Sequence, residues 1–264
     1  IYHILNSRLF ATLPGKQTIN EVAEGYGKSL RDANEMDLTS ASPESHVSSI
    51  KASFPFHPGL RDLYARFKEN PGFQQTRGLI RLMRLVVANM WEKTGAANER
   101  YLVSPFDVDL NDAAISSEIK SINPHLGSAI AHDIANEGNS IAELLEVERK
   151  SNNVQDACKC LLVSSLANVP NATVGLTMSE LVHYLSAPNR DLTKLRDDIA
   201  ILSTKAWYLH TNREQRRYFK NVENLNAKLK AQAESFSQES RVKKIRETLE
   251  RYFSPQLKDC YQEI

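Results

Sequence analysis

Apolar residues recur at helical spacing through almost the whole chain, and this periodicity restricts the fold more than any other feature of the sequence. Proline and glycine interrupt it at short intervals, for example at Pro14-Gly15, Pro71-Gly72 and Pro188-Asn189, as they do at the ends of helices. Helices are predicted at 1–12, 17–33, 44–52, 58–68, 73–94, 111–120, 124–136, 140–148, 153–167, 177–186, 191–205 and 221–252. We therefore expect a mainly α-helical protein.

One stretch of the chain predicts β-strands. Residues 207–210 and 217–219 are aromatic-rich runs separated by polar residues, a pattern that is typical of a hairpin. Three predicted helices precede it, and Thr177 and Glu180 have the spacing of a capping box at the start of the second. Three helices followed by a two-stranded wing is the order of a winged-helix domain, whose third helix can enter the major groove of DNA.

The apolar pattern is interrupted between Glu148 and Asn153, where we place a domain boundary. The predicted units are a helical domain at 1–150, a winged-helix-like domain at 151–222 and a C-terminal helical extension at 223–264. A long helix is expected in the extension, although the serines between Ser235 and Ser240 are a point where it would divide. Helical spacing begins at Ile1 with no cap before it, so we expect a piece of a longer protein.

Charge is distributed unevenly, although the formal net charge is only +1. Between Lys205 and Lys258 there are 13 lysines and arginines against 6 aspartates and glutamates. The segment 101–150 has the opposite character, with 9 acidic and 3 basic residues. A basic excess of this kind is typical of a surface that contacts nucleic acid, and equally of a solvated lysine-rich helix.

Basic residues cluster on the third helix of the winged-helix pattern, just before it and on the predicted wing. The candidate DNA-binding residues are Arg190, Lys194, Arg196, Arg213, Arg216, Arg217 and Lys220. Aspartates at positions 191, 197 and 198 oppose contact with phosphate, and winged helices also bind proteins. Both interpretations of this segment stay open at the level of sequence.

Three arginines interrupt the apolar helix predicted at 73–94. Arg77, Arg81 and Arg84 lie within about 60° of one another around a helix, so they share one face of what we expect to be a core helix. Buried arginines need partners. The acidic segment 101–150 would supply them, or the first arginine would face the terminal phosphate of a nucleotide bound on another domain.

No catalytic or metal-binding motif is recognisable in the chain. Gly27-Lys28-Ser29 resembles the end of a phosphate-binding loop, but Val22 occupies the position of its first glycine and no strand precedes it. The three cysteines lack metal-binding spacing, and we expect no metal site and no disulfide. The apolar runs are shorter than the roughly 20 residues of a membrane span, so we expect a cytoplasmic protein without membrane contact.

Two motifs carry a resemblance to a known family. They are Phe54-Pro55-Phe56-His57-Pro58 and, after a short interval, Phe73-Gln74-Gln75-Thr76-Arg77-Gly78-Leu79-Ile80-Arg81-Leu82. This pair resembles the signature of large bacterial ATPases of the domain-of-unknown-function four-nine-nine family. The resemblance implies an AAA+-type P-loop ATPase from a phage-defence locus, of which this chain follows the nucleotide-binding core.

The resemblance also implies roles for particular segments. Residues 1–100 would belong to the helical lid, and Arg77 or Arg81 would be the sensor-2-like residue that contacts the γ-phosphate. ATP and Mg²⁺ would be held by the missing P-loop domain, and this chain alone would not be catalytic. DNA, a DNA methyltransferase of the same locus and further copies in a homo-oligomer are the implied partners. The alternative is a non-catalytic helical adaptor whose winged helix contacts protein.

Overall fold

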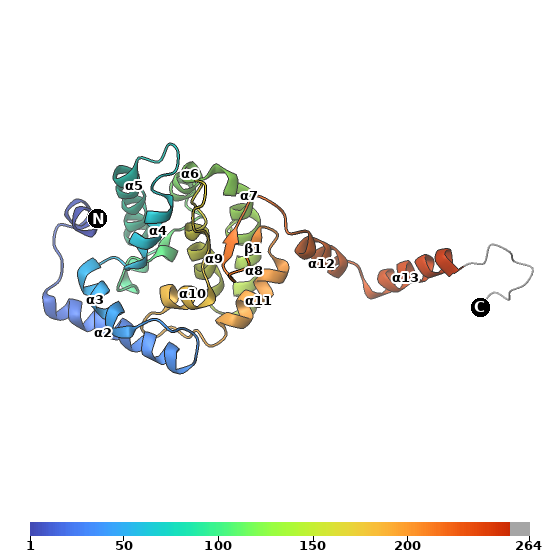
Figure 1. Ribbon diagram of the computed structural model, residues 1–264, viewed down its shortest axis with the longest axis horizontal. Coiled ribbons are helices and arrows are strands. Elements are labelled where there is room, and N and C mark those ends of the chain that lie inside the picture. The colour runs from blue at the N-terminus through green and yellow to red at the C-terminus, as the bar shows by residue number, and fades with distance from the viewer. Residues whose placement is uncertain (254–264) are drawn as a thin grey trace, which may run out of the picture.

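The structure is a computed structural model that describes residues 1–253, and it is mainly α-helical with one small antiparallel hairpin in that part of the chain (Figure 1). The predicted fold class is confirmed at this level. Residues 254–264, which belong to the predicted C-terminal extension, lie outside the described residues. No helix within residues 1–253 has both the length and the apolar character needed to cross a membrane.

The first half of the chain contains short helices joined by tight turns. They are α1 (Tyr2–Leu9), α2 (Lys16–Glu35), α3 (Pro43–Ser53), α4 (Gly59–Phe67), α5 (Gln75–Ala88), α6 (Ala113–Ile122), α7 (Gly127–Ala129) and α8 (Ile141–Arg149). Short 3₁₀ or π turns lie between some of them: η1 (Asn89–Lys93), η2 (Ala96–Asn98), η3 (Pro105–Asp107), η4 (Pro124–Leu126) and η5 (Ile130–Ile134). The helix predicted at 124–136 is thus three consecutive short turns, since its proline and glycine come at the start.

The second half follows the predicted order of three helices and a hairpin. It contains α9 (Asn153–Ser164), α10 (Met178–Leu185), α11 (Leu195–Lys205), β1 (Leu209–Thr211), β2 (Arg217–Phe219), α12 (Leu225–Ser235) and α13 (Gln238–Phe253). The capping box at the start of α10 is confirmed, because Thr177 and Glu180 each accept a hydrogen bond from the other's backbone N–H.

The predicted single long C-terminal helix is wrong, because α12 and α13 are separate helices. Phe236 is extended, with φ of −79° and ψ of 136°, and it ends α12. The Ser237 hydroxyl then accepts a hydrogen bond from the Ser240 N–H at 3.2 Å, which satisfies a free donor at the start of α13. The serines therefore divide the helix by local hydrogen bonding. Helix α12 begins against α11, and α13 lies beyond it, away from the helical body (Figure 1).

One hydrophobic core runs through the helical body from Leu5 to Phe219. Helix α9 is at its centre, where it packs against α4 and α8 on the N-terminal side and against α10, α11 and β2 on the C-terminal side. Cys158 and Cys160 are fully buried core thiols on this helix. The core is therefore continuous across the boundary that the sequence suggested near residue 150.

A smaller cluster joins α2 and α3 to the body. Ala23 and Tyr26 of α2 pack with Val47 and Ile50 of α3 and with Leu102 of the loop that precedes η3. In Figure 1 the pair lies at the lower left, with α3 to the left of α10 and α2 running below it. This arrangement brings Tyr26 toward the chain segments that precede α9 and α11.

The hairpin has a third, bridge-like neighbour between α9 and α10. Strands β1 and β2 pair with Leu209 opposite Phe219 and Thr211 opposite Arg217. On the outer side of β2, Leu176 and Arg217 exchange two backbone hydrogen bonds of 3.0 and 2.8 Å. The C-terminal part of the body thus has the order helix, bridge, helix, helix, hairpin.

Candidate functional site

The arginine stripe of α5 faces solvent rather than the core. Arg77, Arg81 and Arg84 are all exposed, while the buried residues of α5 are Gly78, Leu79, Leu82, Met83 and Val86. The prediction that these arginines are buried is therefore wrong. An apolar helix can still be amphipathic, and here the three cations occupy its outward face.

One of the three arginines has an acidic partner. A nitrogen of the Arg81 guanidinium lies 2.7 Å from a carboxylate oxygen of Glu118 on α6, and this hydrogen bond raises the pKa of Arg81. Glu118 belongs to the acidic segment 101–150, as one interpretation of the sequence expected. Arg77 and Arg84 form no ion pair with any residue of the described part of the chain. Arg77, in the first turn of α5, is thus open to contact from outside.

Three of the seven candidate DNA-binding residues make contacts within the protein. The Arg190 side chain is only 11% exposed and lies 2.7 Å from Asp156, so it belongs to an internal pocket. Arg216 binds both carboxylate oxygens of Glu180, at 2.9 and 3.0 Å. Arg196 donates a hydrogen bond to the backbone carbonyl of Asp37.

The other four candidates differ in exposure. Lys194, Arg213 and Lys220 are exposed and form no ion pair within residues 1–253. Arg217 is half-buried, and burial lowers the pKa of its guanidinium. The opposing charge on α11 is reduced, because Asp198 is buried against Arg149 at 2.6 Å. Three free cations therefore remain on the predicted DNA-binding face.

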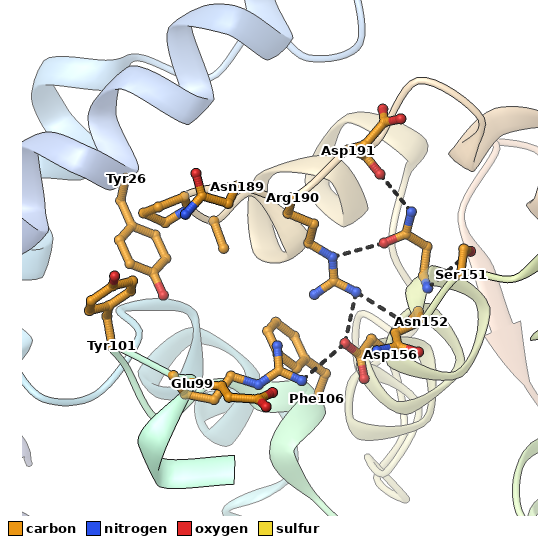
Figure 2. A pocket seen from close by; sticks show the side chains of 14 residues that line it. Tyr26, Glu99, Tyr101, Phe106, Ser151, Asn152, Asp156, Asn189, Arg190 and Asp191 are labelled. Carbon is orange, nitrogen blue, oxygen red and sulfur yellow. Dashed lines mark hydrogen bonds and ion pairs between the residues drawn. The ribbon is translucent and has the colours of Figure 1, made fainter.

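A polar pocket of about 320 Å³ lies beside the turn between α10 and α11, and it was not predicted from the sequence. Figure 2 shows the guanidinium group of Arg190 beside the ring of Phe106. The central guanidinium carbons of Arg100 and Arg190 each lie 5.0 Å from the centre of this ring. Asp156 lies 2.7 Å from Arg190 and 3.6 Å from Arg100. The useful signal was Asp156 itself, since a carboxylate on the buried helix α9 needs a buried partner.

Two further carboxyl groups near this pocket have perturbed acidity. Burial raises the pKa of Asp107 to about 6, although Arg100 and the Ser104 N–H favour its charged form. Burial likewise raises the pKa of Glu146 to about 7, against a hydrogen bond from the Gln155 N–H. The pocket thus lies over a buried network in which cations and carboxyl groups nearly balance.

Two buried histidines, His46 and His57, and the half-buried His183 form a second cluster that the sequence did not reveal. His46 of α3 and His183 of α10 are 2.9 Å apart between Nδ1 and Nε2, and the ring centres of His46 and His57 are 5.4 Å apart. Burial lowers the pKa of all three side chains, that of His46 to about 3. Across residues 1–253, no group of three or more His, Cys, Asp or Glu side chains is arranged to hold a metal ion.

Comparison with known families identifies the helical body. A family model described as DUF499 second domain matches residues 1–220. The chain belongs to the DUF499 family. The DUF499 match ends directly after β2, so it includes the arginine stripe, the pocket, the histidine cluster and the hairpin. No curated protein and no solved structure matches the chain.

Proposed function

We propose that this DUF499 domain is the lid and winged-helix region of an AAA+-like ATPase that acts on DNA in phage defence. The observation that supports DNA contact most directly is the order helix, bridge, helix, helix, hairpin, combined with three unpaired cations on it. In a winged helix, a short strand between the first two helices pairs with the wing, and the Leu176–Arg217 bridge occupies that place. The third helix is then α11, which begins directly after Lys194.

The DNA surface is assigned to the cations that remain available. Lys194 precedes α11, Arg213 lies in the turn between the strands, and Lys220 follows β2, so all three lie on or beside the winged-helix unit. Lysines and arginines of α12 and α13 extend this basic surface beyond the hairpin. Contacts of this kind bind phosphate without reading sequence, and their affinity falls steeply with salt.

A salt-titrated binding assay tests this surface. The K194E/R213E/K220E variant is expected to weaken binding of a duplex oligonucleotide at low salt by more than about 10-fold and to flatten the dependence of affinity on salt. The matched control is K28E/R31E/K120E, which makes the same charge change at exposed positions on α2 and α6. Equal binding by the two variants, or no binding by the unaltered chain at low salt, contradicts DNA contact.

The lid assignment places Arg77 opposite ATP held with Mg²⁺ by a P-loop domain. Support comes from the exposed, unpaired guanidinium in the first turn of α5, whereas Arg81 is occupied by Glu118. A cation over the γ-phosphate stabilises the charge that develops during hydrolysis. In a protein that carries both domains, R77A is expected to lower ATP turnover at least about 10-fold. R84A, about two helical turns further along the same face, is expected to leave it unchanged. Normal turnover in R77A contradicts the sensor role.

The alternative, a non-catalytic adaptor that binds protein, is favoured by one observation. Helices α12 and α13 expose large apolar side chains, among them Leu225, Leu229, Ile245 and Tyr252, each at least 60% exposed. Exposed apolar stripes of this length are typical of protein contacts. The adaptor would bind its partner even when Lys194, Arg213 and Lys220 are reversed in charge.

A further inference from the structure

The polar pocket beside the turn between α10 and α11 is built from segments that are far apart in the chain. Tyr26 comes from α2, Tyr101 from the loop that leads into η3, Phe106 from η3 itself, Asp156 from α9, and Asn189 from the turn between α10 and α11 (Figure 2). Its volume of about 320 Å³ is within the range of small-ligand sites. The pocket therefore has the size of a ligand site, and its walls come from most of the elements around it.

Two tyrosines offer the pocket groups that a ligand could contact: the hydroxyl of Tyr26 and the ring of Tyr101. The Tyr26 ring is only 4% exposed, and its hydroxyl makes no hydrogen bond to any residue among 1–253. In Figure 2 this hydroxyl points into the hollow. Burial raises the pKa of Tyr26, so the group stays a neutral hydrogen-bond donor. Tyr101 is 54% exposed, and no other aromatic ring of the described chain stacks on it.

The charges of the pocket favour a neutral polar ligand over a free anion. Arg100 and Arg190 both contact Asp156, and Arg100 also lies 3.5 Å from Asp107. Two more carboxylates, Glu99 and Asp191, belong to the lining. The Nη1 of Arg190 has no hydrogen-bond partner, but each of the two guanidiniums already has a carboxylate beside it. A phosphate therefore gains little net attraction here, while a planar group with polar edges gains stacking and hydrogen bonds.

The position of the pocket connects it to the proposed DNA surface. Asn189 and Arg190 line it, and four residues after Arg190 the chain reaches Lys194 and the start of α11. Asn189 has a left-handed backbone, with φ of 65°, and its side-chain amide makes no hydrogen bond within residues 1–253. An amide and a phenol hydroxyl are suited to the edge of a nucleobase, and an aromatic ring is suited to its face.

We propose that this pocket takes an unstacked nucleobase of single-stranded DNA, with the base lying on Tyr101 and its polar edge against the Tyr26 hydroxyl and the Asn189 amide. The inference rests on the proposed DNA contact, and it adds a preference for single strands or for bases turned out of a duplex. Aromatic stacking of this kind does not depend on sequence, because every base has a flat face. The cations beside α11 hold the flanking phosphates.

Binding of single-stranded and duplex oligonucleotides of equal length tests the pocket. The unaltered chain is expected to prefer the single strand, and Y101A to weaken single-strand binding about 10-fold while duplex binding is unchanged. Y101F keeps the ring and is expected to bind like the unaltered chain. A 2-aminopurine in the oligonucleotide reports the same contact, since its fluorescence is quenched on stacking and is recovered in Y101A.

The outcomes separate this inference from the function on which it rests. If Y101A changes neither duplex nor single-strand binding, the pocket is not a base-binding site, but the proposed DNA surface is unaffected. Absence of all DNA binding at low salt overturns both. If a free deoxynucleotide such as dAMP binds through Tyr101 while oligonucleotides do not, the pocket is a site for free nucleotides, and the proposal that it takes a base of DNA is wrong. Loss of duplex binding in Y101A also contradicts the proposal, because a stacked base pair does not enter the pocket.

Discussion

At the scale of the residue, Gly175 connects several segments of the C-terminal unit through its backbone. Its N–H donates to the Ser164 carbonyl at 3.1 Å, and its own carbonyl accepts from Arg66 at 2.8 Å and from Arg216 at 3.0 Å. It has φ of 80°, and a Cβ at this position would lie far inside van der Waals contact with the carbonyl oxygen of Arg217. The absence of a side chain therefore permits the bridge beside β2.

Alanine at position 175 would have two costs: the contact of its Cβ with the Arg217 carbonyl and the left-handed backbone, and a control variant separates them. G72A is the matched control, because Gly72 has φ of 81° and nothing within 4 Å of its would-be Cβ. G72A is expected to lower the free energy of unfolding by about 1 kcal/mol through the left-handed backbone alone. G175A is expected to cost about 1–3 kcal/mol more, because the bridge must move. Urea unfolding measures both, and equal losses would mean that the bridge contributes nothing.

At the scale of the element, the histidine cluster of His46, His57 and His183 joins α3, the turn before α4, and α10. His57 is fully buried, and its Nδ1 accepts a hydrogen bond from the Gly59 N–H at 3.0 Å. Burial comes first among the causes that lower the pKa of each histidine, and charge on a neighbouring histidine lowers the pKa of His46 and His57 further. The contact between these helices is therefore formed by neutral imidazole rings, and protonation of the histidines weakens it.

The pH dependence of the free energy of unfolding, compared between wild type and H46Q, tests whether the histidine cluster is neutral in the folded protein. The folded pKa of His46, about 3, lies below the unfolded value of about 6.5, so between these values only the unfolded chain binds the proton. The stability of wild type relative to H46Q is therefore expected to be full above pH 6.5 and to fall by up to about 1.4 kcal/mol per pH unit below it. H125Q, at an exposed histidine, is the control.

Comparison with a variant is needed because other groups oppose the histidines. Asp107, with its pKa raised to about 6, and Glu146, with its pKa raised to about 7, bind protons in the folded state first. Their contribution increases stability as pH falls, so it partly cancels the effect of the histidines on the slope of the free energy of unfolding against pH. The difference between wild type and H46Q removes this common contribution. If the difference in free energy of unfolding between wild type and H46Q stays constant between pH 6.5 and 4.5, His46 is not held neutral in the folded protein.

The elements themselves were largely predictable, and the reasons for the exceptions are physical. The hairpin and the capping box of Thr177 depend on residues close in sequence, and both are confirmed. The face of α5 was misjudged, because three-dimensional packing decides which side of an apolar helix meets solvent. The pocket was missed because Tyr26 and Arg190 are distant in the chain. Winged-helix identity, the lid and the roles of the cations remain predictions.

Helix α13 allows a test that separates stability from binding. None of its described side chains is buried, and it extends away from the body (Figure 1). Truncation after Phe236 is therefore expected to change the free energy of unfolding by less than about 0.5 kcal/mol. Because the deleted segment carries several cations, the same truncation is expected to reduce the slope of log affinity for DNA against log salt. A large loss of stability would show that α13 packs on the body.

At the scale of the whole molecule, the continuous core and the proposed boundary near residue 150 lead to different expectations. Helix α9 buries Cys158, Cys160 and Leu161 completely, between α4 and α8 on one side and α10 and α11 on the other. A fragment starting at residue 151 would expose the side of α9 that faces α8. We therefore expect the body to unfold as one unit, with lid and winged helix as functional regions rather than separate folding units.

The two tryptophans of the chain make this expectation measurable, because one lies on each side of the boundary. Trp91 belongs to η1, and Trp207 lies directly before β1. In W207F the fluorescence reports the N-terminal side, and in W91F it reports the C-terminal side. After correction for each variant's change in stability, the two urea transitions are expected to coincide with each other and with far-UV circular dichroism, as in a two-state protein. Separate midpoints would instead establish two domains that divide near residue 150, and a 151–222 fragment with dispersed amide resonances would support the same division.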